Sequence, residues 1–337
     1  MSALFELREA SKIFQSGPPW QREMTVAVDQ VSFAIPAARP TITGVVGESG
    51  SGKTTVALML LGQVPPSKGQ VLYRGQDLAK LPAGERMTFR REVQPIFQDP
   101  FAAFNPFYRV DHVLTTPLAR FRLAASAQEA DRRVHEALEL VGLRPAETLG
   151  RFPHQLSGGQ RQRIMVARAL LCQPKLIVAD EPVSMVDASL RATILAGLQT
   201  LNRDLGISIL YITHDLTTAY QVCDNIIVMY GGTVVEAGSV EQVIRNPQHP
   251  YTQLLISSIP SVDRSQRWSE AEAEERVGGA NKKSRGCKFA ARCALAQDRC
   301  WESPPPLYRT ASDRVVSCVL YDQNPLAQSR EMAEIME

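Results

Sequence analysis

The chain has 337 residues, of which 44% are hydrophobic and 21% charged, and its 37 basic and 35 acidic residues give a formal net charge of +2. Chains of this length usually exceed one compact core, and so balanced a charge gives no indication of nucleic-acid binding. Residues 1–8 lack the apolar core of a signal peptide, and no apolar stretch approaches the roughly 20 residues of a membrane helix. We therefore expect any membrane association to depend on partners.

The first element with a chemical signature is an apolar strand, expected over residues 42–46, that runs into a glycine-rich loop. Residues 47–54 fit the phosphate-binding pattern G-x-x-x-x-G-K-[ST]. Its backbone N–H groups can wrap a phosphate at the start of a helix near Lys53. Lys53 would reach the β- and γ-phosphates, and the Thr54 hydroxyl would bind Mg²⁺. The predicted nucleotide-binding residues here are Gly47, Glu48, Ser49, Gly50, Ser51, Gly52, Lys53, Thr54 and Thr55.

Strand and helix signals alternate from about residue 42 to 240, which favours a mainly parallel sheet flanked by helices. Within this region, residues 100–165 are more helical, and residues 127–141 carry apolar side chains at spacings of three and four. Residues 156–162 then read Leu-Ser-Gly-Gly-Gln-Arg-Gln. This heptapeptide alone could be chance, but it follows a phosphate loop.

Two further apolar strands end in polar side chains. Residues 175–181 read Lys-Leu-Ile-Val-Ala-Asp-Glu, so that Asp180 would hold Mg²⁺ through water and Glu181 would position the attacking water. In another protein such a pair would more often begin a solvated loop. Residues 207–213 form a strand that ends at His214, at the same edge as Glu181. A lone histidine is usually structural, but at this position we expect it to contact the γ-phosphate.

Together, residues 47–54 and 156–162 resemble the phosphate loop and the signature of ATP-binding-cassette (ABC) ATPases. The resemblance covers about residues 4–260. It implies an α/β fold, in which a P-loop nucleotide-binding domain over residues 1–245 has a helical subdomain near 100–165 and an antiparallel β edge. A single cassette implies that two chains must meet to complete two ATP sites.

The resemblance also assigns roles by position. Gln98, in Ile-Phe-Gln-Asp-Pro, would contact Mg²⁺ and transmit the nucleotide state to a membrane partner. Asp187 would lie at the dimer seam, although Met-Val precedes it where Ala-Leu is common. Phe14 would stack on adenine, unless it is an ordinary aromatic at a strand edge. The residues that would cap the γ-phosphate of the opposite subunit are Ser157, Gly158, Gly159 and Gln160. The predicted catalytic residues are Glu181, His214 and Gln98, and the predicted Mg²⁺ ligands are Thr54, Gln98 and Asp180.

The remainder of the chain, residues 246–337, is an extension that a bare cassette does not need. Its start, Asn-Pro-Gln-His-Pro-Tyr-Thr-Gln-Leu-Leu, followed by Ser-Ile-Pro at 258–260, resembles the segment after the cassette in oligopeptide/dipeptide importer ATPases. Of the two paired ATPases of that family, the chain looks like the second, because Gly-Gln-Arg-Gln-Arg-Ile and Pro-Val-Ser are more typical of it.

Four of the six cysteines lie in this extension. They follow the spacing Cys287-x5-Cys293-x6-Cys300-x17-Cys318. Disulfides are unexpected in a reducing cytosol, so the cluster favours a metal site, and four thiolates could hold Zn²⁺ or an iron–sulfur cluster. The resemblance implies a [4Fe–4S] cluster, with Zn²⁺ and free thiols or incidental disulfides as the alternatives.

The resemblance further implies a peripheral subunit on the cytoplasmic face of the bacterial inner membrane. It would pair with a second, related ATPase or with itself beneath two permease subunits. An extracytoplasmic binding protein would deliver the solute to these permeases. Residues 101–107 would accept a permease helix, or would instead pack inside the helical subdomain. Peptides are the leading solute, and oligosaccharide, glutathione and nickel remain alternatives. ABC proteins of translation or DNA maintenance are a second class, but they usually carry tandem cassettes or long coiled coils. We expect no nucleic-acid partner.

Overall fold

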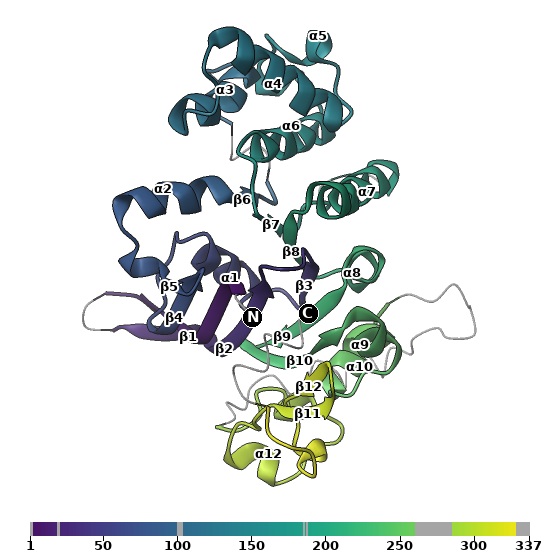
Figure 1. Ribbon diagram of the computed structural model, residues 1–337. Coiled ribbons are helices and arrows are strands. Elements are labelled where there is room, and N and C mark those ends of the chain that lie inside the picture. Colours follow the sequence, from purple (N-terminus) through teal and green to yellow (C-terminus); the bar gives the residue numbers. More distant parts are fainter. Residues whose placement is uncertain are drawn as a thin grey trace.

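The computed structural model describes residues 3–18, 21–99, 104–184, 186, 188–259 and 285–327 (Figure 1). Its main sheet has eight strands in the order β11-β12-β10-β9-β3-β8-β7-β6. Pairing is parallel from β6 to β9 and antiparallel from β9 to β11. The strand bounds are β3 (Ile42–Val46), β6 (Val93–Ile96), β7 (Leu176–Asp180), β8 (Ser208–Thr213), β9 (Asn225–Tyr230), β10 (Thr233–Ser239), β11 (Tyr308–Ala311) and β12 (Arg314–Val316).

The parallel strands are apolar because both faces of the sheet are covered. All five residues of β3 and all six of β8 are buried, as expected for parallel strands between layers. The strands predicted over 42–46, 175–181 and 207–213 are β3, β7 and β8. Parallel strands present their carboxyl ends at one edge, so the residues that follow β3, β7 and β8 lie together.

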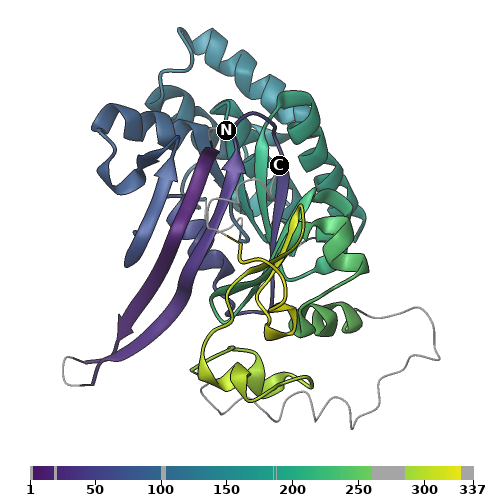
Figure 2. The same ribbon diagram turned by 60° about the horizontal axis from the view of Figure 1, so that its bottom comes forward.

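A second, antiparallel sheet covers one face, with the strand order β2-β1-β4-β5. A core cluster joins both sheets to α1, and contains Phe5, Phe33, Met59 and Val45. Figure 2 shows β1 and β2 extending as a long two-stranded ribbon. The bounds are β1 (Ala3–Ser16), β2 (Glu23–Pro36), α1 (Lys53–Leu60), β4 (Lys68–Tyr73), β5 (Gln76–Asp77) and α2 (Ala83–Glu92).

The helical subdomain has its own apolar core, separate from that of the sheets. Leu114, Leu138 and Ile164 are fully buried in it, one from each long helix. The helix expected over 127–141 is α4, which begins after Ser126, whose side chain accepts a hydrogen bond from the Glu129 N–H. The bounds are α3 (Val110–Arg120), α4 (Ala127–Leu140), α5 (Pro145–Thr148) and α6 (Gly158–Leu171).

The other face of the main sheet packs on α7–α10 and on part of the extension. The extension adds β12 and β11 to the antiparallel end of the main sheet, with Val316 opposite Glu236. The bounds are α7 (Ala188–Leu205), α8 (Leu216–Val222), α9 (Val240–Arg245), α10 (Pro250–Ser257) and α12 (Arg299–Glu302). None of the helices in the described ranges combines the length and apolarity that crossing a membrane requires.

Candidate nucleotide-binding site

The phosphate loop occupies the turn between β3 and α1, and its backbone conformation requires glycine at two positions. Gly47 has φ 152° and Gly52 has φ 99°. A Cβ on Gly47 would lie 2.2 Å from the Met229 carbonyl oxygen, and one on Gly52 would lie 2.4 Å from that of Ala27. The loop is therefore fitted to the neighbouring strands, and a side chain at either glycine would distort it.

Lys53 begins α1 and is buried at the centre of the loop. Its ammonium donates hydrogen bonds to the carbonyl oxygens of Gly47 and Glu48, at 2.8 Å each. Burial lowers the pKa of Lys53, and the nearby carboxylates of Glu181, Asp180 and Glu48 oppose this effect. The ammonium is thus held against the loop, where a phosphate group would sit.

Two of the three predicted magnesium ligands, Asp180 and Thr54, lie together. Asp180 ends β7, and its carboxylate is hydrogen-bonded to the side chain of Thr54 in α1. Burial raises the pKa of Asp180, whereas the Thr54 hydrogen bond and the charge of Lys53 lower it. A carboxylate beside a hydroxyl at a phosphate loop is a donor set suited to Mg²⁺.

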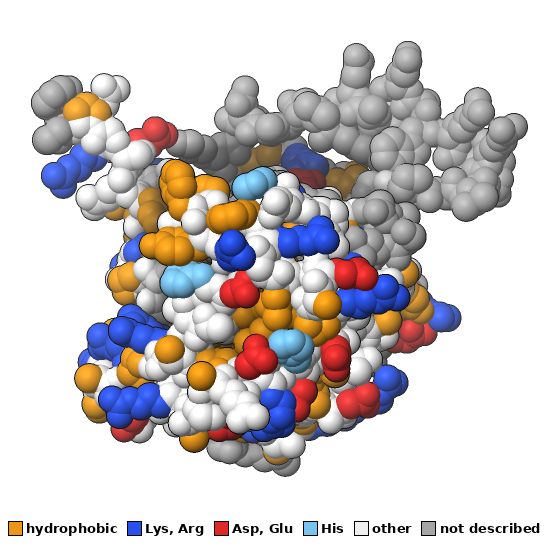
Figure 3. All heavy atoms as spheres, turned by 90° about the horizontal axis from the view of Figure 1, so that it is seen from above, with side chains coloured by type: hydrophobic (Ala, Val, Ile, Leu, Met, Phe, Trp, Pro, Cys, Tyr) orange, Lys and Arg blue, Asp and Glu red, His pale blue; other side chains and the backbone are white. Residues whose placement is uncertain are grey.

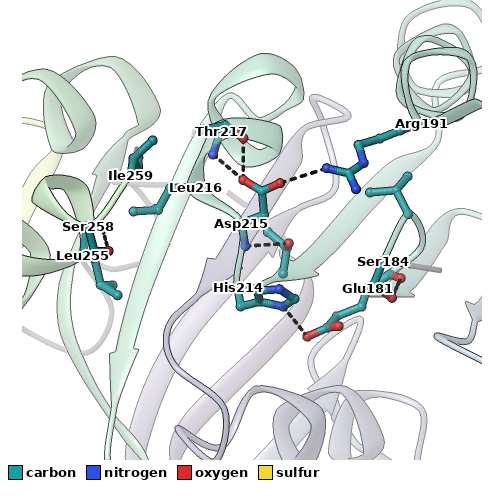
Figure 4. Close-up of a pocket in the computed structure, with 12 residues that line it drawn as sticks. Glu181, Ser184, Arg191, His214, Asp215, Leu216, Thr217, Leu255, Ser258 and Ile259 are labelled. Carbon is teal, nitrogen blue, oxygen red and sulfur yellow. Dashed lines mark hydrogen bonds and ion pairs between the residues drawn. The ribbon is translucent and has the colours of Figure 1, made fainter. Parts of the chain in front are cut away.

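The three predicted catalytic side chains also converge, and Figure 4 shows two of them, Glu181 and His214. The Glu181 carboxylate lies 2.9 Å from Nδ1 of His214, and it accepts a hydrogen bond of 2.8 Å from the Gln98 amide. Glu181 has φ 46°, which is uncommon for a residue with a side chain, and its backbone N–H donates to the Ile212 carbonyl oxygen at 2.8 Å. The carboxylate is therefore fixed in direction on both of its oxygens.

A pocket of about 450 Å³ opens beside Glu181 and His214. Asp215 caps the start of α8 and pairs with Arg191 at 3.5 Å. The lining comes from the segments after β7 and β8 and from α10, as Figure 4 shows. The predicted catalytic residues Glu181 and His214 are thus accessible from a cleft at the carboxyl edge of the sheet.

The signature segment forms the beginning of α6. The Ser157 hydroxyl accepts a hydrogen bond from the Gln160 N–H at 3.2 Å, and the Gln160 side chain accepts one from the Ser157 N–H at 2.9 Å. This capping box is a regular helix start. An added Cβ on Gly158 would meet no atom within 4 Å. The predicted contact of Ser157, Gly158, Gly159 and Gln160 with a partner's γ-phosphate stays a prediction.

Two other predicted residues have different outcomes. Phe14 lies in β1 with 40% of its surface exposed, and the Lys12 ammonium lies 5.3 Å from its ring centroid. An exposed ring is available for stacking, but adenine binding stays a prediction. Asp187 lies outside the described residues.

The four extension cysteines line one small cavity with Phe289 and His249. Burial raises the pKa of Cys318 to about 11, and it also raises that of Cys287 and Cys293. Over the described ranges, however, no three Cys, His, Asp or Glu side chains are arranged to hold a metal ion. The expected metal site is therefore not supported by side-chain geometry, although the predicted convergence of the four thiols is present.

Two residues of the extension contact the phosphate loop, and neither was expected here from the sequence. The Tyr251 hydroxyl accepts a hydrogen bond from the Glu48 N–H at 2.8 Å. Arg292 donates to the Glu48 carboxylate at 2.8 and 3.0 Å. Tyr251 could have been suspected because it belongs to the His-Pro-Tyr segment, whereas Arg292 has no local signal.

Comparisons with known proteins agree with this geometry. Residues 28–184 match the family described as ABC transporter, and residues 235–300 match the oligopeptide/dipeptide transporter C-terminal region. The oligopeptide transport ATP-binding protein OppF of Salmonella typhimurium is 37% identical over 323 residues, covering 94% of this chain and 93% of that protein. The dipeptide transport ATP-binding protein DppF of Haemophilus influenzae is 37% identical over 296 residues, covering 88% and 89%.

A solved structure agrees as well. The dimeric, post-hydrolysis ATP-binding cassette MJ0796, bound to ADP and Pi, superposes with a TM-score of 0.62 at 27% identity, covering 70% of this chain and 98% of that one. The relatives named above are more than 30% identical over most of both chains, which is sufficient to assign a family. This chain is an ATPase that belongs to the ABC transporter ATP-binding proteins of the oligopeptide/dipeptide family.

Proposed function

We propose that this chain hydrolyses ATP to drive import of peptides, as one member of an ATPase dimer beneath two permease subunits. The observation that carries the catalytic part is the Glu181 carboxylate, held by His214 and Gln98 next to the Asp180–Thr54 pair. The names of the relatives support the peptide part. The second member would be a related ATPase or a second copy of this chain.

The chemistry follows from the positions of these side chains. The phosphates of ATP would lie on residues 47–54, with Lys53 and the helix start offsetting their charge. Mg²⁺ would be held by Thr54 and Asp180, and it would neutralise charge on the β- and γ-phosphates. Glu181 would orient the attacking water, which is the main task of protein groups in phosphoryl transfer. His214, with 59% of its side chain exposed, would be free to meet the γ-phosphate.

A permease would dock on the helical subdomain near residues 104–117. Phe107 is 87% exposed. The neighbouring Tyr108 is half exposed, and it lines a groove of about 260 Å³ together with Phe104, His112 and Arg168. Phe104 itself is buried, so the expectation that the aromatics pack inside holds for Phe104 and fails for Phe107. Seen from this end of the molecule, the surface mixes apolar and charged side chains (Figure 3). Residues 101–103 lie outside the described residues.

This arrangement would place the chain peripherally on the cytoplasmic face of the bacterial inner membrane. The test is purification of the chain from solubilised membranes, with identification of the proteins that co-purify. Two permeases and a second ATPase are the expected result, and reconstituted complex should hydrolyse ATP faster when peptide-loaded binding protein is added. Recovery with ribosomes or DNA would overturn the transport assignment while leaving the ATPase chemistry in place.

We further propose that Cys287, Cys293, Cys300 and Cys318 bind an iron–sulfur cluster. The support is that all four thiols line one cavity and that the donor set is the one such clusters use. Anaerobically purified protein should contain iron and sulfide in equal amounts, about four of each per chain. Zinc alone, or no metal, would overturn this assignment.

A further inference from the structure

The phosphate loop is held from outside by two residues of the extension. Glu48, the second residue of the loop, accepts two hydrogen bonds from the guanidinium of Arg292, and its N–H donates to the Tyr251 hydroxyl. Arg292 and Tyr251 lie 244 and 203 residues further along the chain. Both the backbone and the side chain of one loop residue are therefore fixed by distant groups.

Arg292 is itself fixed in place. Its guanidinium lies 5.7 Å from the ring centroids of both Tyr230 and Phe289, so it packs on two aromatic faces. Only 21% of its side chain is exposed. Phe289 also packs against Tyr251, with ring centroids 5.4 Å apart. The two groups that hold Glu48 thus belong to one packed aromatic cluster.

The turn that carries Arg292 has a second attachment to the cassette. The Lys288 ammonium donates hydrogen bonds to the Asp29 carboxylate at 2.8 Å and to the Gly231 carbonyl oxygen at 2.9 Å. Asp29 lies in β2, and Gly231 lies in the β9–β10 turn. With two attachments on different elements, the turn is a rigid support for the guanidinium.

The charge of Glu48 makes this support relevant to nucleotide binding. The loop receives a polyanion, and the Glu48 carboxylate acts electrostatically on the Lys53 ammonium that would bind the phosphates. Without a partner, the same carboxylate would repel those phosphates. A bidentate guanidinium neutralises it and also fixes its direction, which a lysine could not do equally well.

We propose that Arg292 is a positioning residue for ATP, which neutralises Glu48 and, with Tyr251, fixes the start of the phosphate loop. ATP affinity then depends on the extension as well as on the cassette. Because Arg292 directly precedes Cys293, the same contact connects the cysteine cavity to the ATP site. A purely structural contact would only attach the extension to the cassette, and it would leave nucleotide affinity unchanged once the protein is folded.

The test measures KM and kcat for ATP hydrolysis by the full chain in the complex with which it purifies, together with the Kd of a fluorescent ATP analogue. Arg292→Ala should raise KM and Kd about tenfold, the effect of losing a charge-assisted contact. The kcat should change little, because Arg292 does not reach the reacting groups. Arg292→Lys should give an intermediate rise, and the rise should shrink in high salt.

The decisive variant is Glu48→Gln combined with Arg292→Ala. If Arg292 acts by neutralising Glu48, the Arg292→Ala change should raise KM much less in the Glu48→Gln background than in the wild type, with Glu48→Gln alone measured as the reference. Arg299→Ala is the matched control, because it breaks an ion pair with Asp322 inside the extension, and it should leave KM unchanged. If Arg292→Ala fails to fold, the same comparison of KM values is made with Arg292→Lys, alone and in combination with Glu48→Gln. A wild-type KM in the single Arg292 variant, or an equal rise of KM in the Glu48→Gln background, would overturn the proposal.

Discussion

The buried ion pair between Arg314 and Glu236 should hold the extension on the main sheet. Their side chains are 3% and 0% exposed. Arg314 donates to the Glu236 carboxylate with Nε at 3.1 Å and also through Nη2, and Nη2 reaches the Asn246 carbonyl oxygen at 2.5 Å. Arg314→Met would remove these contacts and leave a buried carboxylate with the N–H groups of Gln248 and His249 as partners.

The magnitude follows from what remains around that carboxylate. Breaking a buried pair by removing one partner costs about 3–5 kcal/mol. Because two backbone donors still hold Glu236, we expect the lower end, about 3 kcal/mol, which corresponds to a roughly hundredfold increase in local opening. Hydrogen exchange followed by mass spectrometry should show this increase for peptides covering residues 314–317, which include β12.

The control is an exposed ion pair on a helix. The Arg132 guanidinium lies 2.7 Å from the Glu136 carboxylate in α4, and these side chains are 62% and 57% exposed. Arg132→Ala should lower the free energy of unfolding by no more than about 0.5 kcal/mol. A second variant, with Arg314 and Glu236 both changed to Met, should recover part of the lost protection, since no buried charge remains. If the peptides covering residues 314–317 exchanged at equal rates in Arg314→Met and Arg132→Ala, the assignment of stability to the buried pair would be refuted.

Three further outcomes are expected. Glu181→Gln should lower ATP turnover at least about a hundredfold while ATP still binds, and a mutant complex with wild-type turnover would contradict its catalytic role. Burial lowers the pKa of His249 from 6.5 to about 3, so its contribution to stability is complete above pH 6.5 and is lost as the pH falls toward 3. In His249→Asn, the Asn side chain can still accept a hydrogen bond from the Tyr251 N–H and so cap α10. The free energy of unfolding measured in urea should then depend less on pH between about 3 and 6.5 than in the wild type. An unchanged pH dependence would contradict this role of His249. Ser126→Ala should lower the free energy of unfolding, measured in urea, by about 1 kcal/mol because α4 loses its N-cap, whereas Ser126→Asp should retain most of the wild-type stability.

The sequence was most informative where chemistry depends on short, continuous segments. The phosphate loop is a single stretch after β3. Its glycines, lysine and threonine predicted the turn from strand to helix and also a nucleotide phosphate as the ligand. Asp180, Glu181 and His214 were predicted because parallel strands end at one edge, and β3, β8 and β7 are indeed neighbours in the sheet. The strand order itself, and the long antiparallel ribbon of β1 and β2, could not be predicted from these motifs.

The sequence was least informative where two polar residues meet across a large separation in the chain. Arg314 and Glu236 stand in short strand segments where a charged residue would ordinarily be expected to face solvent. Neither has a local pattern that indicates a partner 78 residues away. The cysteine spacing predicted that four thiols would converge, but it could not predict their separations, because those depend on how the turns around Cys287 and Cys300 pack.

The extension contacts the cassette on several different elements. β12 pairs with β10, Lys288 reaches Asp29 in β2, and Arg292 reaches Glu48 in the phosphate loop. Because these contacts lie on the main sheet, on β2 and on the phosphate loop, the extension should move together with the part of the cassette that would bind the phosphates. A change at Cys293 should therefore act on the phosphate loop through Arg292, the residue that precedes it.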